Sequence, residues 1–252
     1  MTRSTDRRRH SSGAASPRAH LQAVDALRGC AIVLMVIYHF SFDLDYFGVA
    51  DFDFNNSPWW LGFRIVIVST FLSLVGFSLQ LASRHGIDRR RYLRRLGWLV
   101  ACATLVSVAS YLMFPASMIF FGILHFIAVA SVVGLLFVRF RLLSLTVGVG
   151  IIVIGITVGN ELFDSPWLQW LGMMTHKPVT EDYVPVVPWF GVVLLGMWAG
   201  KTFVRDSRPA LLLQSSSRKP VRALAWAGNH SLLIYMVHQP ILIGSLWLLL
   251  TR

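Results

Sequence analysis

His39 lies within a strongly apolar stretch, eleven residues after Arg28, and Asp25 precedes that arginine by three positions. In an α-helix, eleven residues make three turns plus about 20°, so Arg28 and His39 share one helix face about 16 Å apart. An ionisable side chain inside a membrane helix is costly and usually marks a functional site. Histidine titrates near neutral pH, so it is suited to remove a proton from an amine or hydroxyl, and its ring can also accept an acyl group. The pattern therefore predicts proton transfer or acyl transfer on this helix.

Asp43 follows His39 by four positions and would lie on nearly the same face, where it could orient the imidazole if the helix continues. Arg64, His125 and His238 are expected at similar depth, from the middle to the external half of the membrane. Four polar groups at that depth on four separate helices predict a polar cavity.

Simpler interpretations of these residues stay open. A lone membrane histidine can hydrogen-bond a neighbouring helix, and Arg64 can extend to the lipid headgroups. Asp25 and Arg28 can form an ordinary ion pair at the start of a helix. The sequence contains no Gly-rich phosphate loop, no HExxH zinc motif and no Gly-x-Ser-x-Gly elbow, so a serine triad is not expected.

The elements that must position these residues are apolar helices. The chain has 252 residues, of which 55% are hydrophobic and 14% charged, a composition typical of polytopic membrane proteins. Seven apolar stretches of about 20 residues predict an all-α bundle of about seven transmembrane helices. They lie near residues 22–42, 60–82, 94–114, 118–138, 142–160, 186–204 and 226–249. Residues 21–252 are expected to form one transmembrane domain after a disordered basic tail, residues 1–20.

The net charge of +11 does not indicate a nucleic-acid partner, because the basic residues lie between apolar stretches. Most of the 23 lysines and arginines fall on one side of the predicted spans, which places the N-terminus in the cytoplasm. The two cysteines lie in apolar runs and suggest neither a disulfide framework nor a metal site, so no metal is expected. The aromatic residues of the external segment 161–185 suit either the membrane interface or stacking on a sugar ring.

Several segments carry a resemblance to a known family. They are residues 24–29 with 38–40, 71–79, 120–127, 182–185 with 188–191, and 228–235 with 238–240. The most specific pieces in combination are Phe-Gly-Ile-Leu-His (121–125), Asp-Tyr-Val-Pro (182–185) and His-Gln-Pro (238–240). Over residues 21–249 the chain resembles bacterial members of the heparan-α-glucosaminide N-acetyltransferase catalytic-domain family. The spacing from Arg28 to His39 is also similar to that of the wider group of membrane acyltransferases that modify cell-surface glycans.

The resemblance implies an integral membrane acyltransferase, N- or O-directed. It would move an acetyl or other acyl group from cytosolic acyl-CoA, with acetyl-CoA as donor substrate, to an external glycan or amino-sugar. His39 would act as general base or acyl carrier, and Arg28 would contact the phosphates or pantetheine of coenzyme A. The expected catalytic residues are His39, Asp43, His125 and His238, and the expected donor-binding residues are Asp25, Arg28 and Asn229.

One departure from the family changes the expected mechanism. In the lysosomal member, the proposed acetyl-accepting histidine lies in the luminal loop after the helix with the Asp…Arg-Gly motif. The corresponding loop here, residues 41–59, contains no histidine. Direct transfer in a ternary complex, with His39 as base, is therefore favoured over a covalent acetyl-histidine in that loop.

The expected location is the bacterial inner (cytoplasmic) membrane, with multiple passes through the lipid, and a homo-oligomer is left open. Two alternatives are also left open. One is a histidine-lined transporter or exporter that performs no acyl transfer. The other is a structural or assembly protein whose buried polar residues only join helices.

Overall fold

The computed structural model describes residues 19–84, 86–205 and 216–250. Within these ranges every regular element is helical, which confirms the all-α prediction. The α-helices are α1 (Ala19–Tyr46), α2 (Pro58–Ala82), α3 (Arg89–Met113), α4 (Ile123–Gly134), α5 (Arg141–Thr157), α6 (Val186–Arg205), α8 (Lys219–Asn229) and α9 (Ser231–Leu250). Short 3-10 helices are η1 (Pro115–Ser117), η2 (Leu135–Phe137), η3 (Glu161–Asp164) and η4 (Gln169–Leu171). The predicted tail, residues 1–20, lies outside the described residues except for Ala19 and His20, which begin α1.

Five of the described helices are long and apolar enough to cross a membrane. These candidate spans are Gln22–Tyr46, Pro58–Ala82, Arg89–Met113, Val186–Phe203 and Ser231–Leu250. The other two predicted spans coincide with shorter apolar helices, Ile123–Phe137 and Arg141–Thr157. A helical membrane protein with several spans is thus confirmed, whereas the count of seven stays a prediction.

The predicted span near residues 226–249 differs most from the structure. His230 leaves helical geometry and separates α8 from α9, so the apolar helix begins only at Ser231. α8 is amphipathic, because Lys219 and Arg222 are exposed whereas Ala225 is buried. The apolar pattern could not reveal this break, because residues 223–228 are all small or apolar.

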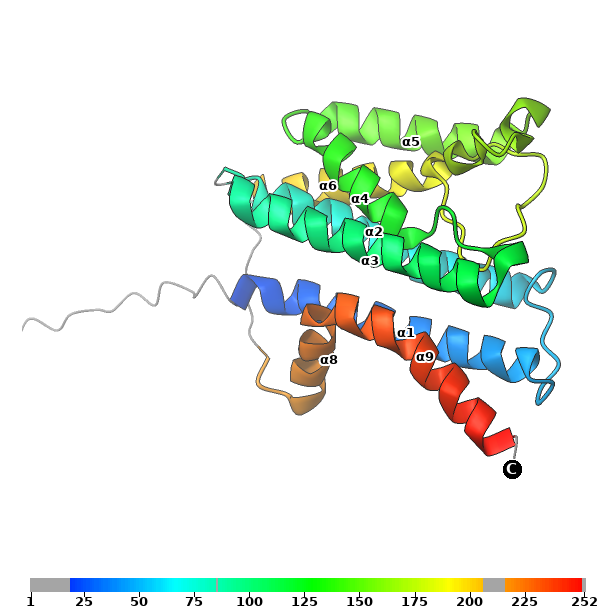
Figure 1. Ribbon diagram of the computed structural model, residues 1–252. Coiled ribbons are helices and arrows are strands. Elements are labelled where there is room, and N and C mark those ends of the chain that lie inside the picture. The colour runs from blue at the N-terminus through cyan, green and yellow to red at the C-terminus, as the bar shows by residue number, and fades with distance from the viewer. Residues whose placement is uncertain (1–18, 85, 206–215, 251–252) are drawn as a thin grey trace, which may run out of the picture.

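The long helices run side by side in two groups (Figure 1). α1, α8 and α9 lie together, α5 and α6 lie on the other side of α2, and α2 packs against both α1 and α6. α3 packs on α4, and the two share an apolar cluster against which residues of α9 pack. The starts of α1, α3 and α5 share one end of the bundle with α8, whereas segments 47–57 and 158–185 lie at the opposite end (Figure 1). The basic residues that begin α3, α5 and α8 are therefore gathered at one end.

Glycines allow the closest helix contacts. A Cβ at Gly76 or Gly196 would collide with backbone atoms across the α2–α6 crossing, and a Cβ at Gly29 or Gly228 would collide across the α1–α8 crossing. In lipid the hydrophobic effect does not drive helices together, so close backbone packing at small residues supplies much of the association energy. The two crossings fix α6 on α2 and α8 on α1.

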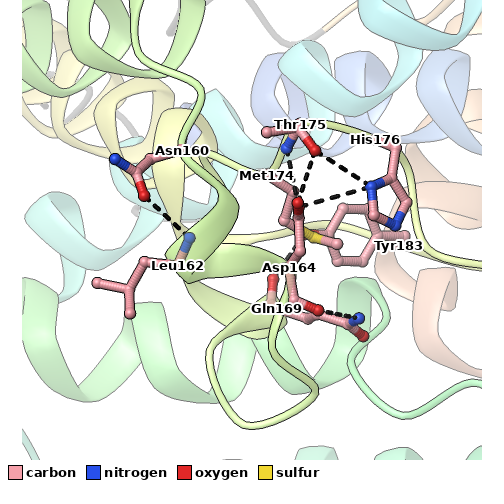
Figure 2. A network of polar contacts seen from close by, with 8 residues as sticks. All are labelled: Asn160, Leu162, Asp164, Gln169, Met174, Thr175, His176 and Tyr183. Carbon is pink, nitrogen blue, oxygen red and sulfur yellow. Dashed lines mark hydrogen bonds and ion pairs between the residues drawn. The ribbon is translucent and has the colours of Figure 1, made fainter.

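The segment between α5 and α6 is held by its own polar contacts (Figure 2). The Asp164 carboxylate accepts hydrogen bonds from the backbone N–H of Thr175 at 2.9 Å and from its hydroxyl at 2.6 Å. The Tyr183 hydroxyl donates to the Gln169 carbonyl oxygen at 2.6 Å, and burial raises the pKa of Tyr183 to about 12. The segment thus has a defined shape at the end of the bundle opposite the basic residues.

Candidate active site

Two imidazole rings meet where α1 packs against α9. The rings of His39 and His238 lie edge to face, with centroids 4.9 Å apart. Tyr38 and Tyr235 flank the pair, with ring centroids 5.8 Å from His39 and 5.6 Å from His238 respectively. Two of the four predicted catalytic residues are therefore in direct contact.

The hydrogen bond of His238 defines its tautomer. Its Nδ1 lies 2.7 Å from the Tyr235 carbonyl oxygen, which can only accept, so Nδ1 carries the hydrogen. Nε2 must then present a lone pair. This nitrogen is buried and has no partner within the described part of the chain, and the residue is only 8% exposed. A buried imidazole nitrogen with a free lone pair has the form that a general base needs.

Asp43 is in α1, which continues to Tyr46, but its partner is not the predicted one. Its Oδ1 accepts a hydrogen bond from Gln239 Nε2 of α9 at 2.8 Å, and its Oδ2 has no partner among the described residues. The expectation that Asp43 orients His39 is therefore not matched by a hydrogen bond. Gln239 sits beside His238 on α9, so the Asp43–Gln239 bond and the His39–His238 contact together join the same two helices.

His125 is in a separate polar cluster at the start of α4. Its Nδ1 accepts from the Gly122 N–H at 3.3 Å, and its Nε2 lies 3.1 Å from the Ser107 hydroxyl of α3. Ser107 in turn donates to the Ile119 carbonyl oxygen at 2.6 Å, so Nε2–H is the donor to the serine. Both ring nitrogens are satisfied, which suits a residue that joins α3 to α4 and caps a helix.

Asp182 connects this cluster to the histidine pair. Its Oδ2 accepts from the Ile123 N–H at 2.9 Å and from the Tyr235 hydroxyl at 3.1 Å. Burial raises the pKa of Asp182, although these two hydrogen bonds and the charge of Lys177 act in the opposite direction. Gly122 leaves room for the carboxylate, because a Cβ there would collide with it. One carboxyl group thus links the 158–185 segment, α4 and α9.

Arg64 forms a side-chain hydrogen bond with Tyr38, which in turn contacts the ring of His39. Its charge also acts on Lys177 of the 158–185 segment; burial and then this repulsion lower the pKa of Lys177. The structure therefore does not bring all four predicted groups of the polar cavity together. It brings His39 and His238 together, with Arg64 and His125 around them through intermediate residues.

The three predicted donor-binding residues form one cluster. Arg28 donates to Asp25 Oδ1 at 3.0 Å and to the Ser78 hydroxyl of α2 at 2.9 Å. Asn229, at the end of α8, hydrogen-bonds the Asp25 side chain. Arg95 of α3 lies close enough for the Arg28 charge to repel it. Arg28 is paired with Asp25, and Arg95 adds a second positive charge near Arg28, so the cluster keeps net positive charge at the basic end of the bundle.

Three residues of the site were not among the predicted ones: Tyr235, Gln239 and Asp182. Tyr235 and Gln239 flank His238 in sequence, so a search for hydrogen-bonding neighbours of that histidine would have found them. Asp182 lies in the Asp-Tyr-Val-Pro motif, and its partners Ile123 and Tyr235 lie in distant segments, so the sequence alone does not reveal its role. Among the described residues, no group of three or more His, Cys, Asp or Glu side chains could hold a metal ion.

Comparisons with known proteins give one match. The family model described as Heparan-alpha-glucosaminide N-acetyltransferase, catalytic, matches residues 20–240. No curated protein and no solved structure matches the chain. The matched range contains both the Arg28 cluster and the His39–His238 pair.

Proposed function

The chain belongs to the heparan-α-glucosaminide N-acetyltransferase catalytic family, and from this premise we propose that it transfers an acetyl group across the membrane. The donor is cytosolic acetyl-CoA, and the acceptor is an amine or hydroxyl of an external glycan or amino-sugar. The observation that carries the proposal is the contact of His39 with His238, where the buried Nε2 of His238 has a free lone pair.

In this reaction the acceptor nucleophile attacks the thioester carbonyl carbon. A C–N or C–O bond forms, the C–S bond breaks, and the proton of the nucleophile passes to an imidazole of the pair. The sulfur leaves and takes up a proton as the thiol of coenzyme A. A positioned base of this kind contributes about 10²–10⁴-fold to the rate. Of the two histidines, His238 is better suited to accept that proton, because its buried Nε2 has a free lone pair. His39 is its immediate neighbour.

The Arg28 cluster supports the donor side. Its net positive charge attracts phosphate groups, and arginine forms paired hydrogen bonds to them. The rise from Arg28 to His39 is about 16 Å along α1, comparable to the length of an extended pantetheine arm. Coenzyme A phosphates at Arg28 and Arg95 would then leave the thioester near the histidine pair.

The proposed topology is seven crossings with a cytoplasmic N-terminus in a bacterial inner membrane, residues 21–252 forming one domain. Five candidate spans and two shorter apolar helices support this topology. It is also supported by segments 47–57 and 158–185, which share the end opposite the basic residues (Figure 1). Basic residues favour the cytoplasmic side. The acceptor then approaches from the end that carries the 158–185 segment.

The test uses the full chain in proteoliposomes with radiolabelled acetyl-CoA outside or inside and glucosamine as a probe acceptor. We expect acetylated glucosamine when donor and acceptor are on opposite sides, and loss of product in His238→Ala. His230→Ala is the matched control, because His230 is exposed and its ring contacts, with the carbonyl oxygen and the ring of Trp226, are local. Substrate flux without any donor would favour the transporter instead, and full transfer by His39→Ala and His238→Ala together would refute the assigned base.

A further inference from the structure

Buried polar atoms without partners are concentrated at the α1–α9 contact. Five such side-chain atoms occur among the described residues, and three of them belong to Asp43, His238 and Gln239. Buried polar atoms are nearly always hydrogen-bonded, so each exception needs a physical explanation. The free Nε2 of His238 is explained by its role as a base. The other two atoms, Asp43 Oδ2 and Gln239 Oε1, are not explained by that role.

Asp43 and Gln239 face one another through one hydrogen bond, from Gln239 Nε2 to Asp43 Oδ1 at 2.8 Å. The remaining oxygen of Asp43, Oδ2, is an acceptor if the carboxyl is ionised, and the Gln239 oxygen, Oε1, is always an acceptor. With an ionised carboxyl both oxygens are left without a donor among the described residues, although Asp43 is only 2% exposed. An ionised carboxylate in this condition is strongly unfavourable inside a membrane protein, because no cation neutralises it.

One proton on Asp43 would give both unpartnered oxygens, Asp43 Oδ2 and Gln239 Oε1, a hydrogen bond. A protonated Asp43 Oδ2 is a donor, and the only free acceptor on its partner is Gln239 Oε1. A carboxylic acid and a primary amide can then exchange two parallel hydrogen bonds in the orientation that the 2.8 Å bond already sets. No ligand, ion or water is needed to satisfy either group.

We propose that Asp43 and Gln239 form a neutral acid–amide pair that holds one proton and fixes α9 against α1, so that His238 stays beside His39. Both are positioning residues: they act on the reaction through the placement of His238. This positioning role rests on the proposed function, whereas the proton on Asp43 does not.

The surroundings of the pair are consistent with a neutral acid. On α1, His39 lies one turn before Asp43, and Asp45 is engaged with the Phe52 N–H at 2.7 Å. On α9, His238 is the adjacent titratable group, and its Nδ1–H is already donated to Tyr235. No ion pair among the described residues includes Asp43. Neither its own helix, α1, nor α9 therefore supplies a cation that would keep the Asp43 carboxylate charged.

The decisive measurement is the infrared difference spectrum between wild type and Asp43→Asn at neutral pH, in bilayers of the full chain. We expect the wild type to show the carbonyl band of a protonated carboxylic acid that shifts in D₂O and is absent from Asp43→Asn. Asp45→Asn is the matched acid-to-amide control and should retain the band. A difference spectrum that contains only carboxylate bands would overturn the proposal, whether or not the protein transfers acetyl.

Turnover of Asp43→Asn and of one further variant, Asp43→Leu, tests positioning. Asn at position 43 can exchange the same two hydrogen bonds with Gln239, so Asp43→Asn should keep turnover within about threefold of wild type. Asp43→Leu fills the space but leaves the Gln239 amide unsatisfied, so turnover should fall by about tenfold or more while KM for acetyl-CoA changes little. Loss of turnover in Asp43→Asn as severe as in Asp43→Leu would contradict the acid–amide pair and indicate that a charged Asp43 binds a donor group of the acceptor.

Discussion

His125 and His238 both lie on apolar helices, yet their surroundings differ in one decisive respect. The His125 ring has a partner at each nitrogen, Gly122 N–H and the Ser107 hydroxyl. The His238 ring bonds the α9 backbone at Tyr235 and Ile234, and its buried Nε2 has no partner among the described residues. An imidazole with partners at both nitrogens stabilises the fold, whereas an imidazole with a free buried lone pair can accept a proton from a substrate. Residue type and depth alone do not separate the two roles.

The largest expected effect comes from His238→Ala. Loss of the base should lower acetyl transfer by about 10²–10⁴-fold, and the thermal unfolding temperature should fall less than in His125→Ala, because only one of the two ring nitrogens of His238 is hydrogen-bonded among the described residues. Initial rates and a melting curve of the same preparation check this. A large fall in Tm with normal transfer per folded molecule would erase the distinction between the two histidines.

His125→Ala should show the opposite behaviour. It leaves the Gly122 N–H and the Ser107 hydroxyl without their imidazole partner, so the free energy of unfolding should fall by about 1–3 kcal/mol. Turnover per folded molecule should stay near wild type. Ser107→Ala is the matched partner variant, and a double-mutant cycle between the two should reveal their coupling. If His125→Ala stops turnover in fully folded protein, His125 belongs with the catalytic residues after all.

Asp182→Asn tests the connection between the two sites. Because burial raises the pKa of Asp182 above its unfolded value, folding favours the protonated acid; stability is greatest below the unfolded pKa and declines as pH rises through the folded pKa. The Asn variant cannot titrate, yet its amide oxygen can still accept from Ile123 and Tyr235. We expect the pH dependence of Tm above the unfolded pKa to become weaker in the variant. An unchanged pH profile would mean that Asp182 is not the titrating group.

The smallest effect is expected for the contact between Asp164 and Thr175, because its hydrogen bonds involve neither His125 nor His238. The hydrogen bonds from Thr175 to Asp164 (Figure 2) hold the pKa of Asp164 below its usual range. This contribution is therefore present above the unfolded pKa and is lost as pH falls through the folded pKa. Thr175→Ala should speed hydrogen exchange of residues 160–176 at neutral pH without changing Tm measurably. Acid pH should reduce the difference between variant and wild type.

The helices could be predicted from the sequence because about 20 apolar residues suffice to cross a membrane. The shared site of His39 and His238 could be anticipated from depth, since both lie in the same half of the expected bilayer. The hydrogen-bond partner of Asp43 could not be anticipated from the sequence. Its one-turn spacing from His39 indicated a contact within α1, but the Gln239 amide on α9 offers a direct donor. Polar pairing between helices depends on rotation about each axis, which an apolar pattern does not specify.

The hydrogen-bonded state of His125 has a local signal in the sequence. Three positions separate it from Gly122, the spacing at which a side chain caps the start of its own helix. Asp182 had no such signal, since its partners Ile123 and Tyr235 come from two distant segments. Apolar length thus predicts where helices lie, whereas the choice between a structural and a chemical histidine requires the neighbours in space.

The attachment of α9 has a practical consequence for handling the protein. Much of the α9 surface is exposed, including the side chains of Leu233, Ile241 and Leu249. Contacts of Tyr235, His238 and Gln239 hold the helix in place. We therefore expect detergent to loosen α9 before it unfolds the rest of the bundle. If it does, a preparation that is monodisperse and helical would lack the proposed contact of His238 with His39. Retention of the bilayer during purification is the condition under which this site should be assayed.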